Sequence, residues 1–145
     1  MKFENLKISW SPCFIAIVLQ KLNKLDEALF NLRKCLAIRQ LVLSPNNLTI
    51  ASTYNSIAEI LQARGSWIDA LELNQACQGI YEVVLGKNHP STATIYDSIA
   101  SQFQSMGRLD EAMAMYRTAL KIREVELGKF WKRKAFFQCR LIWFY

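Results

Sequence analysis

An internal repeat with a 42-residue period constrains the fold of this 145-residue chain more than any other feature. Between residues 52 and 87, 13 of 36 positions are identical to their counterparts one period further along. A further step of one period toward the N-terminus recovers Ile15, Ala16, Gln20, Ala28, Ile38 and Leu43. A fixed period in this range is typical of solenoids, in which stacked units bury one another's apolar faces.

Each unit has the pattern of two helices. In the third unit an apolar stripe at helical spacing ends at Gly107, and Gly65 and Asn23 occupy the same position in the earlier units. The stripe consists of Ile95, Ile99, Ala100, Phe103 and Met106. We expect a second helix from about residue 109 to 127, ending at Gly128. Its expected buried side comprises Ala112, Met115, Tyr116, Ala119, Ile122 and Val125.

Small residues recur once per unit, where the two helices of a hairpin would approach closely. The three sets are Ala16, Ala58 and Ala100; Ala28, Ala70 and Ala112; and Cys35, Cys77 and Ala119. A larger side chain at such a position would force the helices apart, so we expect all nine to be buried. Cys35 and Cys77 are thereby explained as packing residues, and a disulfide between them is not expected.

These motifs resemble the tetratricopeptide repeat (TPR) in its 42-residue, kinesin-light-chain-like form. The resemblance rests on Tyr54-Asn55-Ser56-Ile57-Ala58, on His89-Pro90-Ser91-Thr92-Ala93, and on residues 96–100 followed by 106–112. It implies an all-α, right-handed superhelical solenoid of about three hairpins with an atypical C-terminal segment. The expected organisation is an N-terminal segment, 1–11; an array, 12–129, with repeats at about 12–48, 49–90 and 91–129; and a tail, 130–145.

The sequence departs from this pattern at three places. Pro12 and Cys13 stand where later units have Tyr-Asn or Tyr-Asp, so the first helix is degenerate. The heptad segment by which kinesin light chains join heavy chains has no counterpart, which argues against a motor subunit. After Lys129 the repeat register stops, and Phe130-Trp131-Lys132-Arg133-Lys134 replaces the next Asn-His-Pro-Ser-Thr.

The tail carries most of the net charge of +6, because residues 129–145 hold five basic residues and no acid. Positions 1–128 therefore carry only +1, and the same tail contains seven aromatic residues. Three interpretations remain open. The tail could be an atypical capping helix, a basic-aromatic segment that binds a membrane surface, or non-repeat sequence from a frameshift, unspliced intron or gene fragment.

Few residues are candidates for catalysis or for binding a metal. The chain has a single histidine, His89, in a turn before Pro90, and four widely spaced cysteines without a CxxC pair. We therefore expect no metal, no cofactor and no enzymatic activity. Free thiols in a reducing compartment and the lack of an apolar run of about 20 residues favour a cytoplasmic location. The apolar run at residues 13–19 is in repeat register, so a core helix is favoured there over a signal peptide.

A binding module is the function that remains. The first helices of a TPR array line a concave surface, and their polar positions define an expected peptide-binding groove: Ser52, Asn55, Glu59, Gln62, Thr94, Asp97, Ser101 and Gln104. By resemblance, Asn55 matches the asparagine that often holds ligand backbone in this family, and Asp97 is its acidic counterpart. The expected function is a protein-interaction scaffold, alone or as a piece of a longer array. Alternatives are a merely solvated face, or nucleic-acid or membrane-surface binding through the tail.

Overall fold

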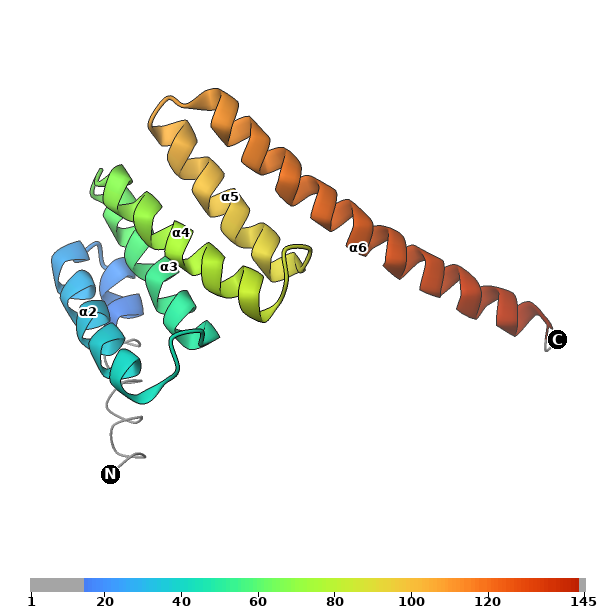
Figure 1. Cartoon of the computed structure of the whole chain (residues 1–145), viewed down its shortest axis with the longest axis horizontal. Helices are drawn as coiled ribbons and strands as arrows, with labels where there is room; N and C mark the ends of the chain where they lie inside the picture. The colour runs from blue at the N-terminus through green and yellow to red at the C-terminus, as the bar shows by residue number, and fades with distance from the viewer. Residues whose placement is uncertain (1–14, 144–145) are drawn as a thin grey trace.

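The computed structural model describes residues 15–143, and all regular structure in this range is helical (Figure 1). A helical segment at residues 15–21 is followed by five helices: α2 (Leu25–Val42), α3 (Leu48–Ala63), α4 (Trp67–Val84), α5 (Pro90–Ser105) and α6 (Leu109–Trp143). Each of the five helices packs against the next along the chain. The expected all-α solenoid of hairpins is thereby confirmed. The predicted N-terminal segment, 1–11, lies outside the described residues.

The turns inside the three hairpins have the same geometry at equivalent positions of the repeat. Asn23, Gly65 and Gly107 have φ values of 59°, 83° and 75°, in the left-handed region that favours glycine and asparagine. In the middle hairpin the amide of Ser66 donates to the carbonyl of Leu61 at 2.8 Å, and equivalent bonds close the other two turns. These bonds satisfy carbonyls that the end of a helix would otherwise leave unpaired.

The first helices of the second and third hairpins begin at equivalent caps. The side chain of Asn47 accepts a hydrogen bond from the amide of Thr49 at 2.8 Å, and His89 Nδ1 accepts one from the amide of Ser91 at 3.0 Å. His89 therefore has the structural turn role that its position predicts, and Pro90 occupies the first turn of α5.

The small residues of each unit lie where the hairpins pack. All nine positions predicted from the repeat are at most 3% exposed. Around them, larger apolar side chains form clusters that join successive hairpins, the largest fully buried ones being Ile50, Ile60 and Ile99. The burial of Ala58 and Ala100 confirms that the second and third units stack in register.

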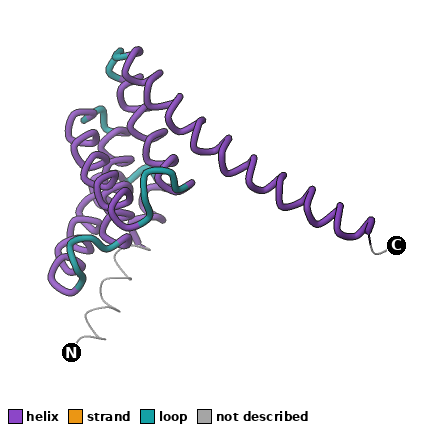
Figure 2. Tube along the Cα trace, turned by 45° about the vertical axis from the view of Figure 1, so that its right-hand side comes forward, coloured by secondary structure: helices purple, strands orange, loops and turns teal. Residues whose placement is uncertain are grey.

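The last helix differs from its prediction. Instead of ending at Gly128, α6 continues without interruption to Trp143. Figures 1 and 2 show its distal half projecting away from the stack, so it does not fold back over α5 as a capping helix would. The cause is the chemistry of residues 129–143, which contain no Gly, Pro, Asn, Asp or Ser to stop a helix. Both earlier hairpin-to-hairpin loops contain asparagine, and a proline lies within the first (Pro45) or directly after the second (Pro90).

Two side chains of α6 that the repeat pattern predicts to be buried are exposed. Tyr116 is 37% exposed and Val125 is 52% exposed, although both were expected on the buried side. Ala112, Ala119 and Ile122 are buried against α5 as predicted, and Met115 is half-buried. The buried side of α6 is narrower than expected because, in the described part of the chain, only α5 packs closely against it.

The cysteines give a mixed result. Cys77 is a free, buried thiol, and burial raises its pKa to about 12, which makes it unreactive at neutral pH. Cys35 is also buried, but it is disulfide-bonded, so the expectation of a free thiol is wrong for this residue. Cytoplasmic location remains a prediction. Within residues 15–143, no helix combines the length and apolar character that crossing a bilayer requires.

Candidate functional site

A polar hollow of about 480 Å³ lies between the middle and last hairpins. Its walls come from four helices: Glu59 and Gln62 of α3, Asn74 of α4, Thr94, Asp97, Ser98 and Ser101 of α5, and Tyr116 of α6. Gln62 of α3 reaches Ser101 of α5 at this place, so the hollow lies where these two helices face each other. We refer to these eight residues as the polar hollow.

The structure brings five of the eight predicted groove residues into this one hollow: Glu59, Gln62, Thr94, Asp97 and Ser101. The other three, Ser52, Asn55 and Gln104, do not line it. Asn55 lies one turn before Glu59 and Gln104 one turn after Ser101, and both make hydrogen bonds to residues of the hollow. Ser52 is exposed further toward the start of α3.

Hydrogen bonds along the wall fix the positions of its polar groups. The amide nitrogen of Gln62 donates to the hydroxyl of Ser101 at 3.2 Å, which ties α3 directly to α5 across the hollow. On α3, the amide nitrogen of Asn55 donates to Glu59 Oε1 at 2.9 Å. The carboxylate of Glu59 is thereby oriented by its own helix, because residues four apart lie on the same helical face.

The last helix contributes two further contacts. Arg123 of α6 forms an ion pair with the carboxylate of Asp97. The hydroxyl of Tyr116 donates to Gln104 Oε1 at 3.2 Å. Asp97, expected to meet a ligand, is therefore already engaged by a cation of its own hairpin.

Three residues of the hollow were not predicted: Asn74, Ser98 and Tyr116. The sequence does indicate that Asn74 is unusual. The first unit has Leu32 at the equivalent position, whereas in the second unit an asparagine interrupts the apolar stripe. Asn74 is 1% exposed, and among the described residues no donor forms a hydrogen bond to its side-chain oxygen. Buried polar atoms without partners are rare, which makes this one informative.

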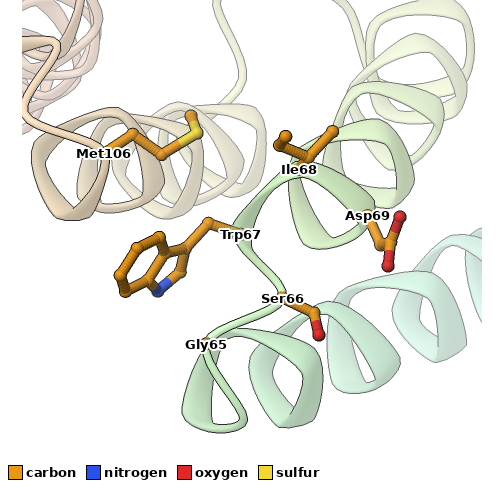
Figure 3. Close-up of a pocket in the computed structure, with 6 residues that line it drawn as sticks. All are labelled: Gly65, Ser66, Trp67, Ile68, Asp69 and Met106. Carbon is orange, nitrogen blue, oxygen red and sulfur yellow. The ribbon is translucent and has the colours of Figure 1, made fainter.

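A second hollow, of about 510 Å³, lies at the turn between α3 and α4. Its lining is Gly65, Ser66, Trp67, Ile68, Asp69 and Met106, none of which was predicted to bind a ligand. Figure 3 shows the Trp67 ring on the side of Met106, whereas the side chains of Ser66 and Asp69 point away from it. The lining of this second hollow combines the apolar side chains of Trp67, Ile68 and Met106 with the polar side chains of Ser66 and Asp69.

Among the residues described, no three His, Cys, Asp or Glu side chains gather as metal ligands would. The polar hollow can instead exchange hydrogen bonds with a bound segment, from side chains that the hairpins hold in place.

Comparison with known proteins places these observations in a family. The tetratricopeptide repeat model matches residues 49–124, and a second model of the same description matches residues 14–48. No curated protein matches the chain significantly.

Solved structures with the same fold include BtubC (BKLC) from P. vanneervenii, with a TM-score of 0.76 and 18% identity over 80% of this chain and 46% of that one. The TPR-like repeats of a Podosopora anserina protein described as a kinesin light chain have a TM-score of 0.71 and 24% identity, covering 79% of this chain and 54% of that one. The chain thus spans about half the length of both proteins.

The TPR domain of Arabidopsis FLU has a TM-score of 0.73 and 16% identity, over 83% of this chain and 98% of that one. At these identities the structural matches show the fold alone. The model match over residues 49–124, together with the hairpins described above, shows the family: the chain belongs to the tetratricopeptide repeat family.

Proposed function

We propose that this chain is a non-catalytic protein-interaction module that binds a segment of a partner protein in the polar hollow. TPR repeats support a role as a protein–protein interaction scaffold in general. The location of the binding site is supported by one observation: five side chains predicted from the repeat line a single hollow between consecutive hairpins. An extended or helical segment there would exchange hydrogen bonds with fixed polar groups.

The affinity of such a site is expected to be moderate. The hollow is shallow and polar, and a flexible segment loses conformational freedom when it binds. We expect dissociation constants in the micromolar range, about −8 kcal/mol.

The test uses a side chain that fills the hollow. Peptides selected from a random phage-displayed library on the full chain are measured against Thr94→Trp and against Gln75→Trp. Thr94 lines the hollow and is exposed, whereas Gln75 is exposed on α4 and does not line it. We expect Thr94→Trp to weaken binding about tenfold or more, equivalent to about 1.4 kcal/mol, and Gln75→Trp to leave it unchanged.

Circular dichroism and thermal unfolding of both variants establish that the helices remain folded. Selected peptides that bind Thr94→Trp as tightly as the parent chain would show that the binding site lies elsewhere and would refute the proposal.

A further inference from the structure

The polar hollow offers hydrogen-bond acceptors and few free donors. The hydroxyl of Thr94 donates to the carbonyl of Pro90 at 3.4 Å, and that of Ser98 donates to the carbonyl of Thr94 at 3.2 Å. The hydroxyl of Tyr116 is likewise used, because it donates to Gln104. Each of these hydroxyl oxygens can still accept a hydrogen bond through its lone pairs, but its hydrogen already takes part in a bond within the protein.

Two amide side chains, those of Gln62 and Asn74, also line the hollow. Gln62 uses an N–H to reach Ser101 across the hollow. Asn74, which is almost fully buried in the same wall, has an amide oxygen that no donor in the described structure satisfies. This oxygen is enclosed by protein atoms, so it belongs to the packing of the wall and a ligand in the hollow does not reach it.

The two carboxylates of the hollow differ in how their charge is compensated. Asp97 is paired with Arg123, so its negative charge is largely balanced. Glu59 accepts a hydrogen bond from the neutral amide of Asn55, and no basic side chain of the described residues forms an ion pair with it. The hollow therefore retains one uncompensated negative charge beside a surface of acceptors.

We infer that the polar hollow selects a basic side chain, arginine or lysine, in the segment that it binds, an inference that rests on the proposed function. A guanidinium carries five N–H donors and an ammonium three, with no acceptor on either, so both complement a wall of oxygens. An acidic side chain would meet Glu59 with like charge and has no donor to offer the hydroxyl oxygens. The basic group is expected to lie between Glu59 on α3 and the hydroxyl oxygens of α5.

The experiment compares three synthetic peptides on the full chain by fluorescence anisotropy. They share a neutral Gly-Ser sequence and differ only in a central arginine, citrulline or glutamate. Citrulline has the shape of arginine without its charge. We expect the arginine peptide to bind about fivefold to tenfold more tightly than the citrulline peptide, the glutamate peptide to bind most weakly, and the preference to shrink as salt screens the charge.

Two carboxylate variants locate the source of the preference. Glu59→Gln keeps the size of the side chain and its bond from Asn55, and should reduce the arginine preference to about twofold or less. Glu124→Gln removes an exposed carboxylate on α6 that does not line the hollow, and should leave the preference unchanged.

The outcomes separate this inference from the proposed function. Equal affinity for the arginine and citrulline peptides, with both weakened by Thr94→Trp, would overturn the cation preference and leave the groove assignment in place. An arginine preference that survives both Glu59→Gln and Thr94→Trp would show that the arginine side chain binds outside the polar hollow, and would also overturn the inference. Failure of all three peptides to bind would count against it in the same way.

Discussion

The middle hairpin, α3 and α4, and the last hairpin, α5 and α6, carry related sequences one repeat apart, yet their second helices have different surroundings. Helix α4 packs against α3 on one side and α5 on the other. Helix α6 packs against α5, and no other described helix packs extensively on it. The same repeat thus shows a covered and an uncovered version of one helix.

The consequence is visible at equivalent positions of the two helices. On α4, Leu71, Asn74 and Gln78 are buried or half-buried; on α6, the equivalent Met113, Tyr116 and Leu120 are 53%, 37% and 56% exposed. The side chains of α6 are as apolar as those of α4 or more so. Their exposure is therefore set by whether a further helix packs against them, as expected for a solenoid whose units contact only their neighbours.

The hydrogen bonds between hairpins show the same contrast. Across the α4–α5 contact, the hydroxyl of Tyr96 donates to Glu82 Oε1 at 2.6 Å; within α4, the amide nitrogen of Gln78 donates to the same oxygen at 2.7 Å. Across the α2–α3 contact, the amide nitrogen of Gln40 donates to the hydroxyl of Tyr54 at 3.0 Å. On α6 the equivalent Glu124 is exposed to solvent.

The largest expected effect comes from Ile80 of α4 and its equivalent on α6, Ile122, both of which are buried. Truncation of either to alanine leaves a cavity, at a cost of about 3 kcal/mol for a well-confined site. We expect Ile80→Ala to lower the free energy of unfolding by about this amount and to reduce amide protection in both hairpins, because α4 joins them. Ile122→Ala should loosen chiefly α5 and α6, since α5 is the helix of the described chain that packs closely on α6.

Urea unfolding with native-state hydrogen exchange measures both quantities. If the two substitutions reduce protection equally along the whole of residues 25–127, the described array unfolds as one cooperative unit. In that case the different surroundings of α4 and α6 do not make one hairpin less stable than the other.

A smaller effect is expected from Tyr96→Phe, which removes the hydroxyl bonded to Glu82. Hydrogen bonds from Gln78 and Tyr96 lower the pKa of Glu82, so its contribution to stability is present above its ordinary pKa and is lost as pH falls through the lowered value. We expect a loss of about 1–2 kcal/mol at neutral pH, smaller in acid. Tyr54→Phe, whose partner is the neutral Gln40, is the matched control and should lack this dependence on acid.

The alkaline side provides a second readout of the same pair. Burial, followed by the hydrogen bond and charge of Glu82, raises the pKa of Tyr96 to about 12. The unfolded chain then releases this proton at lower pH than the folded chain, so stability falls as pH rises from about 10 to about 12. Tyr96→Phe should remove that part of the fall. Parallel pH–stability curves for the parent chain and the variant would contradict the role given to this pair.

Features that depend on one repeat and its own turn were predictable from the sequence. The left-handed turns at Asn23, Gly65 and Gly107 and the buried alanines at 58 and 100 follow from local backbone conformation and from the spacing of small residues. The same locality explains why five polar positions of α3 and α5 could be assigned to one surface before their contacts were known.

Features that depend on neighbouring hairpins were not predictable in the same way. Asn74 and Tyr116 join the polar hollow only because α4 and α6 pack around α5. Gln102 is fully buried with neither amide atom bonded in the described structure, although Ile60 occupies the equivalent position, and nothing in the repeat pattern indicates why. The length of α6, by contrast, could have been predicted from the lack of stop signals after Gly128.

The smallest expected effect tests the uncovered face directly. Met113→Lys replaces an exposed side chain of α6, and we expect the free energy of unfolding to change by less than about 0.5 kcal/mol. Leu71→Lys makes the equivalent change on α4, where Leu71 packs against the cluster that contains Ile99 and Phe103, and should cost about 1–3 kcal/mol because a charge enters a partly buried site. Chemical denaturation of the two variants gives the comparison. Equal losses would mean that Met113 is covered in solution, and analytical ultracentrifugation would then show whether a second copy of the chain covers it, because only self-association makes the loss depend on protein concentration.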